Sequence, residues 1–179
     1  MHDENKRIFM LNGKPEDVAE EITFGIISIN KSDDKKEKEL NGFERRPIEL
    51  YINCEGGSVI SGFSIIDVIL NSKTPVHTIC NGCAMSMGLH ILVSGHKRYA
   101  MPHSVMMFHQ ISTGGNYIQC KTLADFSEYL VNMNKRLSDF IIERTKMTKT
   151  MIDENYNTKE DKYIFPEEAL KLGIVDEII

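Results

Sequence analysis

Short apolar runs alternate along the chain with longer segments in which apolar residues recur at helical spacing. The short runs have the length of buried strands and lie at residues 7–11, 48–52, 76–80 and 104–108. Helical spacing extends over residues 14–30, 59–70, 87–93 and 123–146. Because strands and helices alternate without hairpins, the pattern predicts an α/β fold with mainly parallel strands.

Two polar segments interrupt this alternation. Residues 31–46 are dense in Lys, Asp and Glu and contain a turn-forming Asn-Gly pair at 41–42. We therefore predict a solvated loop between the first helix and the second strand. A Thr-Gly-Gly segment at 113–115 predicts a flexible joint before the long helix at 123–146.

The composition is that of one globular domain. At 179 residues, with 41% hydrophobic and 26% charged residues, the chain is long enough for a proper core. The net charge of -5, without a basic stripe, argues against nucleic acid as a partner. No apolar run approaches the roughly 18 residues of a membrane span, and the charged N-terminus lacks the apolar centre of a signal peptide. Four cysteines are too few for a disulfide scaffold, so we expect a cytoplasmic protein.

Candidate chemistry centres on Ser86, which follows the third apolar run and opens a predicted helix. A serine on such a strand-to-helix turn can be held exposed, next to backbone N–H groups that favour negative charge. His109 ends the next apolar run and can act as the base of such a serine. Upstream, Gly56 and Gly57 break a strand-like run, and paired glycines let N–H groups face a developing oxyanion.

Several motifs then occur in one order. They are Gly-Gly-Ser-Val at 56–59, Ala-Met-Ser-Met-Gly at 84–88, Lys-Arg-Tyr-Ala-Met-Pro at 97–102, Phe-His-Gln at 108–110 and Glu-Glu-Ala-Leu-Lys-Leu-Gly-Ile-Val-Asp at 167–176. Over residues 7–179 the chain thereby resembles ClpP, the proteolytic subunit of the Clp proteases. This resemblance implies a single peptidase domain at 1–179 with a crotonase-like fold of repeated β-β-α units. It also implies that residues 111–146 form a protruding handle and that residues 31–46 are a loop insertion.

The resemblance implies that Ser86 is the nucleophile and His109 its base. Counting back from the C-terminal motif places the family's catalytic aspartate at Asn157. An asparagine can hold a histidine tautomer through its oxygen, but it cannot offset the charge of the imidazolium. Asp153 and Asp161 are nearby carboxylates that could substitute for it.

Further roles follow for residues around the nucleophile. The backbone N–H groups of Gly57 and Met87 are the implied oxyanion donors, and the side chains of Ile60, Met85 and Met87 are candidates to line the substrate pocket. Core packing is an equally good interpretation of these three side chains. His90 is a rival base, but four residues after Ser86 it is expected to point down the same helix.

The Cys-x-x-Cys at 80–83 has no second pair, so we expect neither a metal nor another cofactor. The first functional hypothesis is a serine endopeptidase that degrades unfolded polypeptides or short peptides inside a homo-oligomer. By resemblance this is a tetradecamer of stacked heptameric rings, with a Clp-type AAA+ ATPase as a possible partner. The alternative, which Asn157 leaves open, is a non-catalytic or weakly active, ClpR-like structural subunit. An acyl-CoA hydratase-like enzyme is a distant third, because it leaves Ser86 and His109 unexplained.

Overall fold

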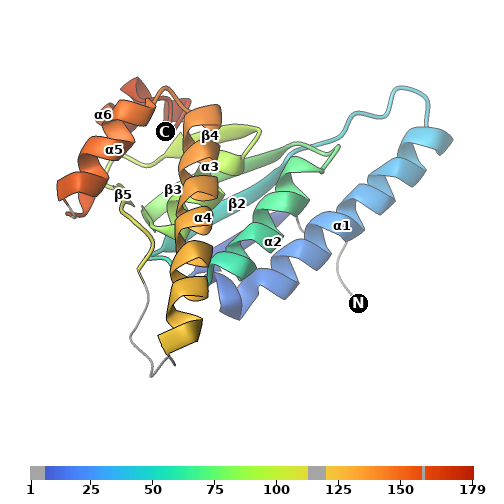
Figure 1. The fold of residues 1–179 in the computed structure, drawn as a ribbon. Helices are drawn as coiled ribbons and strands as arrows, with labels where there is room; N and C mark the ends of the chain where they lie inside the picture. Colours follow the sequence, from blue (N-terminus) through green and yellow to red (C-terminus); the bar gives the residue numbers. More distant parts are fainter. Residues whose placement is uncertain (1–6, 113–119, 159) are drawn as a thin grey trace.

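A seven-stranded sheet forms the centre of the computed structural model, which describes residues 7–112, 120–158 and 160–179, with side chains of the fourth helix described from residue 125 (Figure 1). Its strands are β1 (Ile8–Asn12), β2 (Ile48–Cys54), β3 (Val76–Met85), β4 (Lys97–Ala100), β5 (Val105–Phe108), β6 (Lys162–Ile164) and β7 (Glu177–Ile178). The helices are α1 (Pro15–Glu39), α2 (Val59–Leu70), α3 (Met87–Ser94), α4 (Cys120–Arg144), α5 (Lys149–Thr158) and α6 (Pro166–Lys171). The predicted joint at 113–115 lies outside the described residues.

The sheet is mainly parallel, which confirms the predicted α/β class. Its main order is β1-β2-β3-β4-β7, and every pairing along it is parallel. Strand β3 is long enough to serve two neighbours: its first half pairs with β4 and its second half with β5. Strand β5 also pairs with β6, in the antiparallel sense. The ends of β3 and β5 therefore lie side by side, and β6 runs back beside them.

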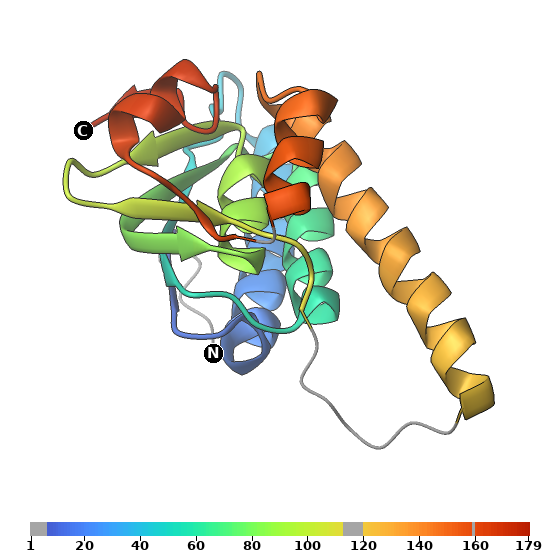
Figure 2. The same cartoon turned by 60° about the vertical axis from the view of Figure 1, so that its left-hand side comes forward.

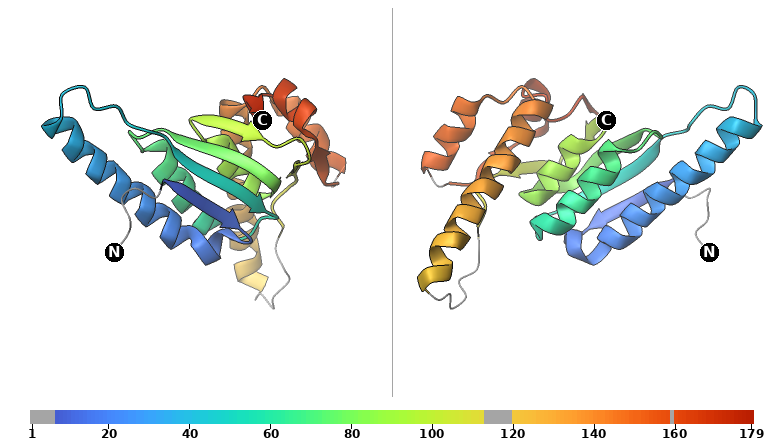
Figure 3. Two further views of the ribbon diagram at one scale, coloured as in Figure 1. Left: turned by 180° about the vertical axis from the view of Figure 1, so that it is seen from behind. Right: turned by 45° about the vertical axis from the view of Figure 1, so that its right-hand side comes forward.

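Helices α1, α2 and α3 cover one face of this sheet, as the views in Figure 2 and Figure 3 show. The core lies between them and the sheet, and it takes the alternate residues Phe9 and Leu11 from β1 and Ile48, Leu50 and Ile52 from β2. Helix α4 packs against α3 near its C-terminal end, and its N-terminal end extends beyond the body of the domain (Figure 2). A protruding helix of this kind agrees with the handle that the sequence predicts.

Helix α1 continues to Glu39, so the prediction of a loop is wrong over residues 31–39. Lys and Glu dominate this stretch, and both are good helix formers. The helix then ends just before the turn at Gly42, whose φ of 78° is easy only for glycine. Charge density indicated solvent exposure correctly for most of these residues, though not for Asp33, and it did not indicate the absence of a helix.

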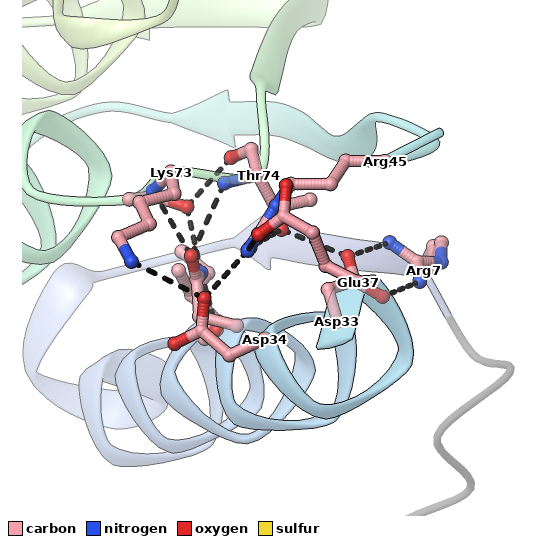
Figure 4. Close-up of polar contacts among 10 residues, drawn as sticks. Arg7, Asp33, Asp34, Glu37, Arg45, Lys73 and Thr74 are labelled. Atoms are coloured by element: carbon pink, nitrogen blue, oxygen red, sulfur yellow. Dashed lines mark hydrogen bonds and ion pairs between the residues drawn. The ribbon is translucent and has the colours of Figure 1, made fainter. Parts of the chain in front are cut away.

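A buried ion pair anchors this part of α1 to the sheet (Figure 4). Asp33 is fully buried and accepts hydrogen bonds from both terminal nitrogens of Arg7, at 2.6 and 3.0 Å, and from the Thr74 hydroxyl at 2.8 Å. Burial raises the pKa of Asp33, but the hydrogen bonds from Arg7 and Thr74 outweigh it and hold the pKa below its usual value. The carboxylate is thus charged and satisfied inside the protein.

On the exposed side of α1, Arg45 forms further ion pairs with the same part of the helix. Arg45, which follows the turn, contacts Asp34 at 2.5 Å and Glu37 at 2.6 Å (Figure 4). Lys73, before β3, adds an ion pair to Asp34 at 3.4 Å. The polar residues of α1 therefore have partners on the connections to β2 and β3, which explains why the charged stretch is an ordered helix.

Candidate active site

Ser86 occupies a strained turn between β3 and α3. Its φ of 51° is the only positive value among the non-glycine residues of the described chain, and its ψ is -120°. A residue held in such a region carries about 1–3 kcal/mol of strain and persists only where the surroundings impose it. Here the Ser86 N–H donates to the Met107 carbonyl at 2.9 Å, which ties the turn to the end of β5.

Gly56 packs directly beneath this turn. A Cβ atom at Gly56 would lie 2.8 Å from the Ser86 Cβ and 3.2 Å from its Oγ, and its φ is 116°. Only glycine fits both the conformation and the space. The glycine pair thus allows the loop after β2 to approach the serine closely.

His109 lies at hydrogen-bond distance from the serine. Its Nε2 atom is 2.8 Å from the Ser86 Oγ. The two residues meet because β3 and β5 are parallel neighbours in the register Met85 to Met107, so that both chains leave the sheet at the same edge. At this distance the imidazole can accept the hydroxyl proton.

Asp161 lies on the other side of the imidazole, with its Oδ1 atom 3.3 Å from the His109 Nδ1. The sheet register explains the contact: Phe108 pairs with Lys162 in the antiparallel β5–β6 ladder, and one step further His109 faces Asp161. The carboxylate holds the proton on Nδ1, which leaves Nε2 free to accept the proton from Ser86. The three side chains thus stand in the order that proton transfer requires.

Asn157, the predicted third residue, does not take this position. It is an exposed residue of α5, and none of the hydrogen bonds found among the described residues joins it to His109. Asp153, another candidate from the sequence, is paired with Lys149 at 2.5 Å on the same helix. Counting back from the C-terminal motif reaches Asn157, whereas the carboxylate that contacts His109 lies four residues later, directly before β6. The signal in the sequence that could have located the third residue is Asp161, an acid directly before the short strand β6.

The proposed oxyanion donors border the same space. Met87 is the first residue of α3, where an N–H group has no partner within the helix. Gly57 has a φ of 151°, and a Cβ there would lie 2.5 Å from Glu16 Oε2. That carboxylate accepts the Ser58 N–H at 2.7 Å, and this hydrogen bond lowers the pKa of Glu16. The first turn of α1 therefore braces the glycine loop.

A cavity of about 300 Å³ opens beside Ser86 and His109. Its apolar lining comes from Val59, Met87, Ile111 and Leu137, while Glu55, Gly57, His90 and Ser112 complete it. Of the three residues predicted for the pocket, Met87 belongs to this lining, whereas Ile60 and Met85 do not. Ile60 projects from α2 with 63% of its surface exposed. The rest of the apolar wall comes from Val59 at the start of α2, Ile111 after β5 and Leu137 of α4.

The cysteine pair shows no sign of reactivity. Cys80 and Cys83 are free thiols, and burial raises the pKa of Cys80 to about 11. Within the described ranges there is no group of three or more His, Cys, Asp or Glu side chains that could hold a metal ion. No helix in the described part of the chain combines the length and apolar character of a membrane span.

A serine held on a strand-to-helix turn, with a histidine and a carboxylate in line behind it, is the arrangement of the serine hydrolases. In this chain the arrangement stands on a mainly parallel α/β sheet with a protruding helix. The model of the Clp protease family matches residues 3–179. The chain therefore belongs to the Clp protease family, and its general class is that of a ClpP-like serine peptidase.

Proposed function

We propose that the protein is a serine endopeptidase in which Ser86 is the nucleophile, His109 the general base and Asp161 the orienting carboxylate. The observation that carries the proposal is the 2.8 Å distance between the Ser86 Oγ and the His109 Nε2. The strained backbone at Ser86 supports it, because a purely structural serine has no need of such a conformation. The substrates we propose are unfolded polypeptides and short peptides.

The reaction follows from the geometry. The Ser86 Oγ attacks the carbonyl carbon of the peptide bond while its proton passes to the His109 Nε2. The electron pair of the carbonyl moves to its oxygen, which the N–H groups of Gly57 and Met87 stabilise. Collapse of this intermediate breaks the C–N bond, and the leaving amine takes the proton from His109.

A water molecule then repeats these steps on the acyl-enzyme. His109 accepts a proton from the water, whose oxygen attacks the acyl carbon, and the bond to the Ser86 Oγ breaks. The oxygen of Ser86 regains its proton from His109, and the second product leaves as a carboxylic acid. Throughout the cycle Asp161 stays ionised and stabilises the imidazolium.

For the assembly we propose a homo-oligomer of stacked heptameric rings that encloses these sites, served by a Clp-type AAA+ ATPase. Membership of the Clp protease family and the projecting helix α4 support it. Sedimentation velocity at micromolar concentration tests it. A mass of seven or fourteen chains of 20.4 kDa agrees with rings, whereas a stable monomer contradicts them.

The test of the catalytic proposal is labelling with a fluorophosphonate probe, located by mass spectrometry. We expect modification of Ser86 and of no other serine, and we expect Ser86→Ala to remove both labelling and cleavage of a fluorogenic peptide. Ser94→Ala is a matched control, because Ser94 is a buried serine at the far end of α3. Undiminished cleavage by the Ser86→Ala protein refutes the proposal. The alternative of a non-catalytic subunit rested on Asn157, and the 3.3 Å contact between Asp161 and His109 favours the peptidase.

A further inference from the structure

His90 is buried on α3, one turn after the nucleophile, and only 3% of its surface is exposed. Its Nδ1 atom lies 2.9 Å from the carbonyl oxygen of Ser86. A carbonyl oxygen can only accept a hydrogen bond, so this hydrogen bond requires the ring proton on Nδ1. This ring is therefore not a second base for Ser86, whose hydroxyl is engaged by His109.

Burial also keeps the His90 ring neutral, because it lowers the pKa of His90 to about 4. A neutral imidazole carries a single N–H, and here it is used on the Ser86 carbonyl. The Nε2 atom faces the backbone of Leu137 on α4, but it makes no hydrogen bond of normal geometry there. The hydrogen bond of normal geometry is thus the one between Nδ1 and the Ser86 carbonyl.

The carbonyl that His90 contacts belongs to the peptide unit between Ser86 and Met87. This oxygen receives two donors, the Nδ1–H of His90 at 2.9 Å and the backbone N–H of Leu89 at 3.1 Å. In a planar trans peptide the C=O and the N–H point in opposite directions. Whatever fixes the Ser86 oxygen therefore also fixes the direction of the Met87 N–H, which is one of the two proposed oxyanion donors.

We propose that His90 is a positioning residue that aims the Met87 N–H at the oxyanion. It acts through the Ser86 carbonyl, and by accepting this hydrogen bond the carbonyl polarises its peptide, which makes the Met87 N–H a stronger donor. The inference rests on the proposed function, since it needs Ser86 as nucleophile. It adds a residue that acts through a backbone carbonyl and stands outside the proton path between Ser86, His109 and Asp161.

The strained turn explains why a second donor is useful here. Ser86 has a φ of 51°, outside the helical range, so the first peptide of α3 is not held by regular helix geometry on its N-terminal side. Removing an oxyanion donor lowers kcat by about 10²–10³-fold. Misdirecting a donor that is still present is a smaller loss, and we expect about a 10-fold decrease in kcat.

Three substitutions at this position separate the role from mere packing. In His90→Asn the side-chain amide N–H takes the place of Nδ1–H, and in His90→Gln the amide lies one methylene further out, nearer the place of Nε2. His90→Leu fills the space without a donor. We expect kcat within about twofold of the unaltered protein for the asparagine variant and about 10-fold lower for the other two, with KM unchanged in all three.

The measurements are kcat and KM on a fluorogenic peptide and the rate of Ser86 labelling by a fluorophosphonate, each on the assembled protein. Equal losses in the asparagine and leucine variants, or no loss in the leucine variant, overturn the inference. Absence of Ser86 labelling in the unaltered protein refutes the proposed function instead. A readout independent of activity is the ¹⁵N spectrum of labelled histidines, with His90 assigned by its loss in His90→Asn. We expect a neutral ring protonated at Nδ1, and a ring protonated only at Nε2 overturns the inference.

Discussion

Replacement of Asp161 by asparagine is the sharpest test of the triad that the structure brings together. The Oδ1 atom of Asp161 lies 3.3 Å from the His109 Nδ1, and it is the carboxylate that faces the imidazole. Asp161→Asn keeps the shape of the side chain but exchanges a charge for a dipole. An amide can also present its N–H to Nδ1, which favours the tautomer with its proton on Nε2 and thereby blocks proton transfer from Ser86.

The expected loss follows from the charge that develops on His109 in the transition state. At 3.3 Å two unit charges interact with about 1 kcal/mol in a water-like dielectric and about 5 kcal/mol at an effective dielectric constant of 20. The Asp161 side chain is 47% exposed and that of His109 23%, so solvent screens the pair and the lower part of this range applies. We therefore predict a decrease in kcat of about 10- to 300-fold, less than the about 10⁴-fold loss known for a buried triad aspartate.

The assay is cleavage of a short fluorogenic peptide at pH 7.5 by assembled protein, with kcat and KM determined separately. The matched controls are Asn157→Asp and Asp153→Asn on α5, for which we expect kcat within about twofold of the unaltered protein. An increase in kcat in Asn157→Asp, together with full activity in Asp161→Asn, refutes the assignment of Asp161. It would return the third position to residue 157.

Three further predictions concern the scaffold. Gly56→Ala places a Cβ 2.8 Å from the Ser86 Cβ at a φ of 116°. We therefore expect loss of fluorophosphonate labelling and a decrease of about 1–3 kcal/mol in the free energy of unfolding measured in urea. Normal labelling of this variant contradicts the close packing. Arg7→Met leaves the buried Asp33 charge unpaired, so we expect the free energy of unfolding to fall by about 3–5 kcal/mol. For the exposed control Lys73→Met we expect a decrease of less than about 1 kcal/mol. His90, with a pKa of about 4 when folded, takes up a proton more readily when unfolded. The free energy of unfolding of the unaltered protein should therefore fall by up to about 3 kcal/mol as the pH falls from 6.5 to 4, and that of His90→Asn should fall less steeply. Equal slopes of unfolding free energy against pH in the two proteins refute the burial of a neutral ring.

The features that the sequence predicted well are local ones. Apolar runs and helical spacing are set by neighbouring residues, so they located the strands β1, β2 and β5 and the helices α2, α3 and α4 to within a few residues. Strand β3 begins at Val76 as predicted but continues to Met85, five residues beyond the predicted end. Strands β6 and β7, of three and two residues, contain too few positions to show a pattern. Strand β4 has four residues like β5, but its sequence Lys-Arg-Tyr-Ala contains no apolar run. They form because a longer strand offers its free edge, and this cannot be seen in the residues of the short strand.

Among the catalytic candidates, too, the sequence placed those that depend on local pattern, and the tertiary structure placed the one that depends on contacts between distant segments. By itself the sequence determined that Ser86 opens a helix after a strand and that His109 ends another strand, because both features are encoded within a few residues. The tertiary structure alone decided that Asp161 stands behind His109, since this depends on the antiparallel register between β5 and β6, whose residues are more than fifty positions apart in the chain. It likewise decided that residues 31–39 are helical, because their partners Arg7 and Arg45 come from other segments. Contacts between distant segments depend on how the sheet is assembled, and no pattern confined to one segment contains that information.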